Sequence, residues 1–245
     1  MITKSEINQL VEKYETIDFI KDDPIQFPHK FQNKEDIEIA GFISSLLAYG
    51  NRKVFIKKLD ELFKIMDYKP LEFVLNFKPE LLENFNYRFG KTEDFVEIFK
   101  ILKELYSKDG GLENLFKYGY KKGEIFQVIC DYFYSKAGSQ AGQGFYFMIP
   151  NPKNGGAMKR MCMFLRWMVR KSPVDLGVWD FIKPGELLIP LDTHVAKLSR
   201  QMGLLSRNSN DFKAVLELTE NLKKYDCDDP VKYDFAMFGY GVNNK

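Results

Sequence analysis

The sequence predicts an all-α protein. Apolar residues recur at helical spacing along most of the 245 residues, and no segment shows the strict apolar–polar alternation of a half-buried strand. Hydrophobic residues make up 45% of the chain and aromatic residues 15%, enough to build a large packed core. No apolar run approaches the roughly 20 residues of a membrane-spanning helix, and the polar N-terminal segment does not resemble a signal peptide. We therefore expect a cytoplasmic protein.

The first half of the chain predicts a series of helices joined by short turns. A helix over about 4–17 is followed by a connector over 24–33, and Asn33 is placed to cap the next helix. That helix is apolar on most sides, which is typical of a central buried helix, and it ends near Tyr49-Gly50-Asn51. Five more helices are expected here. The first runs to about Met66, the second starts at Pro70, and the third is capped by Thr92; the last two cover Leu112–Tyr118 and Glu124–Tyr134.

The second half begins with the longest irregular stretch, 137–156, which is rich in Gly, Gln, Ser and Pro. A short helical turn is expected over Leu176–Ile182, and longer helices over about 158–171, 193–202, 210–224 and 229–239. No repeat or flexible linker is visible. The whole of 1–245 is expected to form a single compact unit, or two lobes of which one combines N- and C-terminal helices.

The cysteines and histidines indicate no metal centre and no disulfide framework. Cys130, Cys162 and Cys227 are far apart and odd in number, and His29 and His194 are the only histidines. All three cysteines are expected to be buried thiols. We expect no metal and no organic cofactor.

Positive charge is concentrated between Asp131 and Asp175, where the chain carries no acidic residue. A local positive field suits a nucleic-acid backbone, although a solvated basic face without a partner would have the same composition. The net charge of +2 does not separate the two. The cations of this stretch are Lys136, Lys153, Lys159, Arg160, Arg166, Arg170 and Lys171.

Two segments carry the residue types of a catalytic site. In the first, the small residues of 154–157 form a turn at the start of a helix, where backbone amides offer a phosphate site. Lys159 follows in the first helical turn, and the helix dipole with Arg166 and Arg170 on the same face favours an uncharged, nucleophilic amine. The alternative is an ordinary phosphate-contacting or solvated lysine.

The second segment places Asp192 at the start of a helix, just after Pro190. An aspartate at this position caps the helix. The same carboxylate can also stabilise a cationic sugar or accept the proton of a nucleophile. The two roles are compatible.

These segments resemble motifs of a known superfamily. The run Leu191-Asp192-Thr193-His194-Val195 resembles the Val-Asp-Thr-His-Val signature of endonuclease III-like and adenine glycosylases. The run 155–159 resembles their Gly-Val-Gly-x-Lys hairpin, with Ala157 in place of the second hairpin glycine. The gap of 33 positions (192 − 159) is longer than in most of the superfamily and is similar to that of archaeal 8-oxoguanine (GO) DNA glycosylases, as is a basic residue, Arg166, seven positions after the lysine. The chain thus resembles the helix-hairpin-helix DNA glycosylases, as a bacterial family within or beside them.

The resemblance implies two helical lobes that flank a DNA-binding cleft, with the hairpin and catalytic region at about 150–205. It implies a monomeric base-excision repair enzyme, both hydrolase and lyase, in the nucleoid-associated cytoplasmic pool. Its partner would be double-stranded DNA with a damaged base, favouring 8-oxoguanine. Lys159 would form a Schiff base with the sugar, with AP-lyase activity, and Asp192 would stabilise the positive charge.

The resemblance also implies binding residues. The loop Tyr49, Gly50, Asn51 and Arg52 would invade the strand. Contacts to the DNA backbone would come from Lys153, Gly155, Gly156, Ala157, Arg160, Arg166, Arg170, Lys171 and His194. Candidates for the base pocket, for which core packing or a plain loop position is the alternative, are Gln140, Gln143, Phe145, Phe147, Met163, Trp167 and Tyr240.

Two other functions stay open. One is a catalytically silent helix-hairpin-helix protein that binds DNA or RNA, and the other is a helical scaffold without a nucleic-acid role. Phosphate binding alone requires neither Lys159 nor Asp192, which favours the enzyme.

Overall fold

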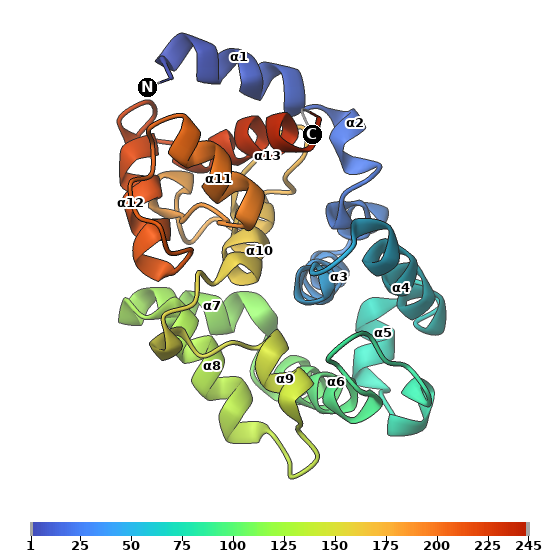
Figure 1. Cartoon of the computed structure of the whole chain (residues 1–245). Coiled ribbons are helices and arrows are strands. Elements are labelled where there is room, and N and C mark those ends of the chain that lie inside the picture. The colour runs from blue at the N-terminus through green and yellow to red at the C-terminus, as the bar shows by residue number, and fades with distance from the viewer. Residues whose placement is uncertain (1, 244–245) are drawn as a thin grey trace. The chain divides into compact units, whose positions relative to one another are not determined.

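The computed structural model describes the backbone of residues 2–243 and the side chains of residues 2–240. Its regular structure over these residues is helical, apart from isolated β-bridges, and this confirms the all-α class (Figure 1). None of the helices described is both long and apolar enough to cross a membrane. The chain divides into two compact units. Residues 22–154 form the middle unit, and the segments up to 21 and from 155 onward form the terminal unit.

The middle unit is organised around α3 (Lys34–Leu47), which Asn33 precedes as the N-cap. Every residue from Ile37 to Leu47 is buried, so the expectation of a central buried helix is confirmed. The helix contacts α5 (Pro70–Leu75) and α7 (Gly111–Lys122). A helix with no polar face needs such neighbours on several sides.

The other helices of the middle unit follow the expected order with shifted ends. Proline occupies the first turn of α5 and of the 3-10 turns at Pro24, Pro28 and Pro79, where its missing N–H costs nothing. Thr92 is the first helical residue of its helix, and Lys91 is the N-cap. The expected loop over 137–156 contains a short helix, α9, and a 3-10 turn. The remaining elements are η1 (Pro24–Gln26), η2 (Pro28–Lys30), α4 (Arg52–Ile65), η3 (Pro79–Leu82), α6 (Thr92–Lys108), α8 (Ile125–Lys136), α9 (Gln143–Met148) and η4 (Pro152–Asn154).

The terminal unit joins the two ends of the described chain. Helix α1 (Lys4–Tyr14) opens with a capping box between Thr3 and Glu6, and it packs along α13 (Tyr233–Asn243) (Figure 1). Helix α11 (Thr193–Gln201) contacts α13 as well. This is the combination of N- and C-terminal helices that the two-lobe alternative describes.

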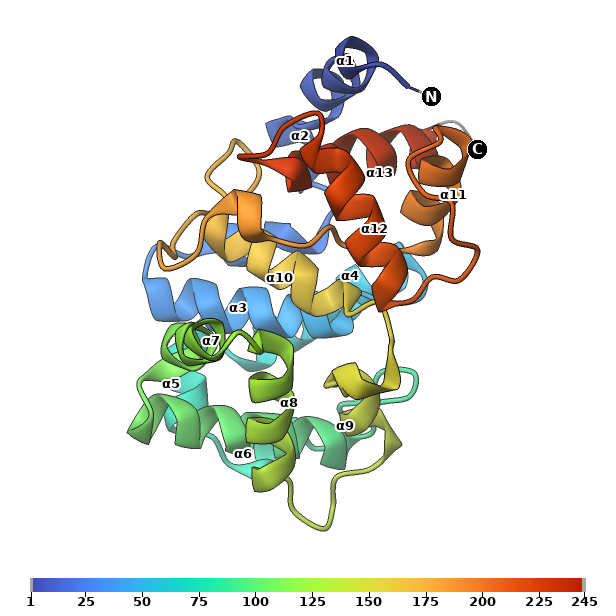
Figure 2. The same cartoon turned by 90° about the vertical axis from the view of Figure 1, so that its left-hand side faces the viewer.

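Helix α10 (Lys159–Val169) belongs to the terminal unit (Figure 2), and its residues from Met161 onward are all buried. The other elements of this unit are α2 (Ile17–Ile20), η5 (Pro184–Glu186), α12 (Phe212–Lys223) and η6 (Pro230–Lys232).

The helical turn expected over 176–182 is wrong. The chain there is irregular, and it runs back against the end of α10. The backbone amides of Leu176 and Gly177 donate to the carbonyl of Trp167, and that of Trp179 donates to the carbonyl of Met168. These bonds satisfy carbonyls at the helix end that have no intrahelical partner, so the segment uses its amides for capping instead of forming its own helix.

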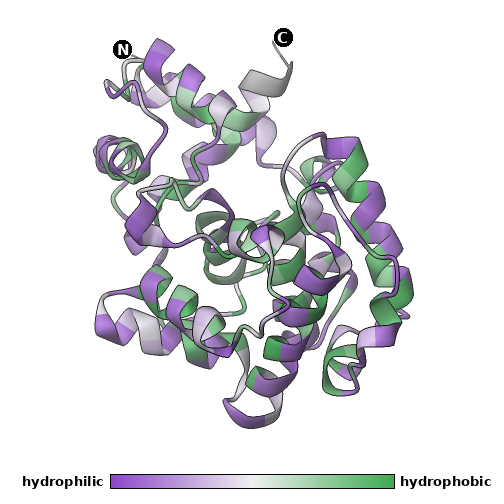
Figure 3. Ribbon diagram, turned by 60° about the horizontal axis from the view of Figure 1, so that its bottom comes forward, coloured by the Kyte–Doolittle hydropathy of each residue, from purple (hydrophilic) through white to green (hydrophobic). Residues whose placement is uncertain are grey.

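Hydrophobic and hydrophilic residues are mixed along most of the ribbon (Figure 3). The expectation for the cysteines needs one correction. Cys130 and Cys162 are buried in α8 and α10, whereas Cys227 is exposed. Cys227 lies in the turn between α12 and η6, where no helix face carries it into the core.

Candidate functional site

Lys159 is the first residue of α10, at the end of a left-handed turn. Gly155 has a φ of 73° and Met158 a φ of 51°, which turns the chain sharply into the helix. Lys159 is half-buried, and its ammonium group forms no hydrogen bond or ion pair with the residues described. A cation at a helix N-terminus opposes the macrodipole, so the helix itself offers this charge no stabilisation.

The turn before Lys159 is open on its outer side. A Cβ built on Gly155 or Gly156 would meet no atom within 4 Å. The inner side is anchored, because the amide of Phe212 donates to the carbonyl of Gly155 at 2.9 Å and Gly156 bridges to Asp211. A backbone fixed on one side and open on the other can be approached closely by a ligand.

Asp192 is the N-cap of α11. Its Oδ1 accepts hydrogen bonds from the amides of His194 and Val195, both at 2.8 Å. These bonds occupy one carboxylate oxygen and fix the side chain in place. The second oxygen takes part in neither bond, so one carboxylate can cap the helix and still present an oxygen elsewhere.

Asp234 in α13 connects the two predicted catalytic residues. Burial raises its pKa to about 7; Arg166 and Lys159 oppose the rise, and the negative charges of Asp192 and Asp175 add to it. Lys159 and Asp192 thus both lie within electrostatic range of this one carboxyl, and all three residues belong to the terminal unit.

The prediction that Arg166 binds the DNA backbone is corrected by the structure. Only 2% of Arg166 is exposed. Its guanidinium pairs with Asp175, at 3.2 Å from Nε, and with Asp234, and it lies 4.3 Å from the centre of the Phe235 ring. A phosphate could reach it only if these bonds were broken.

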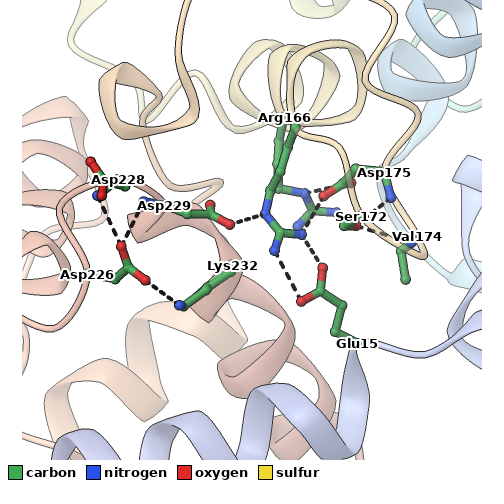
Figure 4. Close-up of polar contacts among 10 residues, drawn as sticks. Glu15, Arg166, Ser172, Val174, Asp175, Asp226, Asp228, Asp229 and Lys232 are labelled. Carbon is green, nitrogen blue, oxygen red and sulfur yellow. Dashed lines mark hydrogen bonds and ion pairs between the residues drawn. The ribbon is translucent and has the colours of Figure 1, made fainter.

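The prediction that Arg170 contacts the DNA backbone is wrong for the same reason. Arg170 is 5% exposed, and carboxylates from distant parts of the chain surround it. Figure 4 shows how these carboxylates, Glu15, Asp175 and Asp229, converge from separate segments. They are Glu15 at the end of α1, Asp175 at 3.0 Å and Asp229 at 2.7 Å. Burial alone would lower the pKa of Arg170, but the hydrogen bond to Glu15 and the charges of Asp175 and Asp229 raise it overall. Buried guanidinium groups need such partners.

This cluster joins two guanidinium groups to four carboxylates, so it does not supply the positive field expected beside Lys159. Carboxylates exceed cations, and burial raises the pKa values of Asp175 and Asp229, while Arg166 and Arg170 oppose the shifts. The surroundings of Lys159 are therefore acidic on the side of Asp234, which suits proton acceptance from an amine.

The other predicted backbone contacts lie at or near the surface. Lys171 is exposed at the end of α10, and Arg160 and His194 are half-exposed near the starts of α10 and α11. Gly156 is exposed, and Gly155 and Ala157 are half-exposed in the turn. Lys153 is exposed too, but it belongs to the middle unit.

The base-pocket candidates are not gathered within one unit. Phe145 is fully buried in the core of the middle unit and Trp167 in the core of the terminal unit, as the alternative of core packing predicts. The indole Nε1 of Trp167 has no hydrogen-bond partner among the described residues. Met163 is buried in α10, Tyr240 is exposed in α13, and Gln143 and Phe147 are exposed in α9.

Gln140 lies outside any such pocket. It is exposed and lines a hollow of the middle unit together with Glu80, Glu83 and Glu93. Carboxylates of this number repel a nucleic-acid strand.

The predicted strand-invading loop lies between α3 and α4. Asn51 is the N-cap of α4, its side chain accepting a hydrogen bond from the amide of Val54. Gly50 has a φ of 84° and is exposed. The Tyr49 ring is packed against Tyr87 and does not extend alone from the surface.

The sequence analysis missed Asp234, Asp175 and the other carboxylates that surround Arg166 and Arg170. One signal was present: the two arginines lie four positions apart in a stretch, 161–170, whose other residues are apolar. Charges in such a setting indicate buried ion pairs more than a solvated face. The identity of the partners had no local signal.

Comparisons with known proteins complete the description. Among the residues described, no group of three or more His, Cys, Asp or Glu could hold a metal ion. Neither the curated proteins nor the solved structures contain a match. One family profile, described as a protein of unknown function (DUF2400), matches residues 23–243. This match covers most of the sequence, and the chain therefore belongs to the DUF2400 family.

Proposed function

We propose that the protein is a DNA glycosylase with AP-lyase activity, in which Lys159 is the nucleophile. Its substrate would be duplex DNA with a damaged base, with 8-oxoguanine the first candidate. The proposal uses the terminal unit alone for its chemistry. The open turn at Gly155 and Gly156 would hold a phosphate through backbone amides.

One observation carries the proposal: the charges of Lys159 and Asp192 both act on the buried carboxyl of Asp234. The amine and the two carboxyl groups come from the starts of α10 and α11 and from α13. Phosphate binding needs no such assembly, because an amide turn with surface lysines suffices. An amine beside a proton acceptor is the arrangement that nucleophilic catalysis requires.

The chemistry follows from these groups. The ammonium of Lys159 first loses a proton to a neighbouring carboxylate, and the free amine attacks C1′ of the deoxyribose. The bond from Nζ to C1′ forms as the glycosidic bond breaks, and the base leaves with the electron pair. Opening of the C1′–O4′ bond gives an imine, and loss of a C2′ proton then expels the 3′ phosphate. Asp192 stabilises the positive charge on the sugar.

Borohydride trapping tests the nucleophile. Purified protein is incubated with duplex DNA that contains 8-oxoguanine or an abasic site, and borohydride reduces any imine to a stable protein–DNA bond. We expect a covalent band that Lys159→Ala abolishes. Lys197→Ala is the matched control, because Lys197 is an exposed lysine of α11 in the same unit. A band that survives in Lys159→Ala would place the nucleophile elsewhere.

The silent DNA- or RNA-binding protein remains the second candidate, because capping of α11 is by itself a sufficient role for Asp192. Asp192→Asn separates the two. The amide oxygen keeps the cap while the charge is lost, so a binder keeps its affinity for DNA and its stability. An enzyme keeps both and loses turnover.

A further inference from the structure

An exposed cluster of aromatic residues in the middle unit has no role in the proposed chemistry. It consists of Tyr49, Tyr87, Arg88, Phe89 and Phe147, and we call it the aromatic platform. The residues come from the loop after α3, the loop before α6, and α9. All three segments belong to the middle unit, so the platform is complete within it.

The rings of the platform are in mutual contact. Ring centres lie 4.8 Å apart for Tyr49 and Tyr87, 4.8 Å for Tyr49 and Phe147, and 5.1 Å for Phe89 and Phe147. The guanidinium carbon of Arg88 lies 5.6 Å from the centre of the Phe89 ring and 5.9 Å from that of Tyr49. Arg88 forms no ion pair with the residues described here.

The loops that carry the platform are fixed to each other. The Tyr49 hydroxyl donates to the carbonyl of Tyr87 at 3.0 Å, and the Tyr87 hydroxyl donates to the carbonyl of Tyr49. Helix α9 packs close to the second loop, because a Cβ on Gly144 would lie 2.5 Å from the carbonyl oxygen of Phe89 (Figure 2). The rings are thus held in place before any ligand binds, which lowers the entropic cost of binding.

Two rings of the platform are exposed, whereas Tyr49 is half-buried and Tyr87 is buried. Phe89 is 56% exposed and Phe147 39% exposed. Exposed apolar rings cost free energy in water, and a rigid group of them indicates a binding surface.

The charge around the platform identifies the kind of ligand. The chain has no acidic residue between Glu38 and Asp60, between Glu83 and Glu93, or between Asp131 and Asp175, and the three segments lie inside these windows. The loop before α6 carries Arg88 and Lys91, and α4, which follows the first loop, begins with Arg52 and Lys53. The Asp94 carboxylate lies near Gly144, but it is buried and accepts hydrogen bonds from the amides of Lys91 and Gly142.

We propose that the aromatic platform binds the bases of an unpaired DNA segment by stacking, with Arg88 and its neighbouring cations on the phosphates. Aromatic rings accept any base on their faces, and a cationic surface follows the backbone, which together make a single-strand site. This inference rests on the proposed DNA substrate and extends it: the protein would hold the strand that opens around a lesion.

The test compares two single strands of equal length, an oligothymidylate and an oligomer of tetrahydrofuran abasic analogues, which cannot form an imine with Lys159. Both oligomers carry the same phosphates, so the difference between their affinities measures what the bases contribute to binding. We expect the wild type to bind oligothymidylate at least about tenfold more tightly than the abasic oligomer. Phe89→Leu should remove about tenfold of affinity for oligothymidylate and leave that for the abasic oligomer unchanged.

Tyr118→Leu is the matched control. Tyr118 is also an exposed ring of the middle unit with a cation over it, Lys122, but it lies on α7 away from the platform. Its removal should change neither affinity. Arg88→Gln is a second variant, and it should weaken binding of both oligomers and reduce the salt dependence. Equal affinities of the wild type for the two oligomers, or an unchanged Phe89→Leu, would overturn the inference.

Borohydride trapping on an abasic duplex separates this failure from a failure of the proposed function. If Lys159 is trapped but the protein binds the two oligomers equally, the proposed chemistry stands and the role of the platform is rejected. If nothing is trapped but the protein prefers oligothymidylate and Phe89→Leu loses that preference, the platform binds bases in a protein that is not a lyase.

Discussion

At the scale of single residues, Asp234 is a carboxyl whose protonation differs between the folded and unfolded chain. Burial raises its pKa to about 7, with Asp192 adding to the rise and Arg166 and Lys159 opposing it. An unfolded aspartate ionises near pH 4. Between about pH 4 and 7 the folded protein therefore keeps a proton that the unfolded chain has lost. Its contribution to stability is complete below this window and is lost as the pH rises through it.

The prediction is a pH-dependent difference between wild type and Asp234→Asn. Relative to the variant, the wild type should lose up to ~1.4 kcal/mol of unfolding free energy per pH unit between about pH 5 and 7. Guanidinium chloride unfolding at several pH values measures it. Asp228→Asn, which removes an exposed carboxyl of the same unit, is the control variant. A wild-type advantage over Asp234→Asn that grows with pH would show the opposite sign and contradict the assignment.

At the scale of elements, α10 has opposite characters at its two ends. Lys159 at its start has no ionic partner among the described residues, while Arg170 just after its end contacts three carboxylates. The first end is available to a ligand, and the second ties α1 and the segment before α13 to this helix. A helix fixed at one end can present a reactive group rigidly at the other.

We therefore expect Arg170→Met to destabilise the protein by about 3 kcal/mol or more, because it leaves Glu15 and Asp229 without their guanidinium partner and the buried Asp175 with Arg166 alone. Lys171→Met, the exposed neighbour, should change stability by less than about 0.5 kcal/mol. Urea unfolding of both variants measures the two effects. Similar stabilities would mean that the ion pairs contribute no more than a surface charge.

The same two arginines show how far sequence reasoning reached. Helix periodicity predicted α3 and α10, since both patterns are local and strong. It placed Arg166 and Arg170 on one face, but it could not show that Glu15 and Asp229, far away in the chain, fold against that face. The prediction of a helical turn over 176–182 was wrong for a related reason, because hydrogen bonds that cap α10 set the conformation of this segment. Lys159 and Asp192 were predicted from motifs, whereas the position of Asp234 beside Arg166 depends on tertiary packing.

At the scale of the whole molecule, the terminal unit depends on a segment that the sequence places far from the rest of it. Helix α1 covers α13, buries Ile7 and Val11, and is followed by Glu15 on Arg170. The middle unit is one continuous stretch with its own central helix. Each unit thus has a distinct set of requirements for stability.

Removal of residues 1–21 should affect the two units unequally. The deletion exposes the face of α13 that α1 covers, and two buried aliphatic side chains alone are worth roughly 3 to 6 kcal/mol. Both tryptophans of the chain, Trp167 and Trp179, are buried in the terminal unit, so tryptophan fluorescence reports on this unit alone. We expect the fluorescence-detected unfolding midpoint in urea to fall sharply, while circular dichroism retains a helical transition from the middle unit. Glu15→Gln, which removes one ion pair and leaves α1 in place, should lower the fluorescence midpoint by much less than the deletion. A deletion that shifts both signals together would mean that the units unfold as one, and the dependence on α1 would then belong to the whole chain.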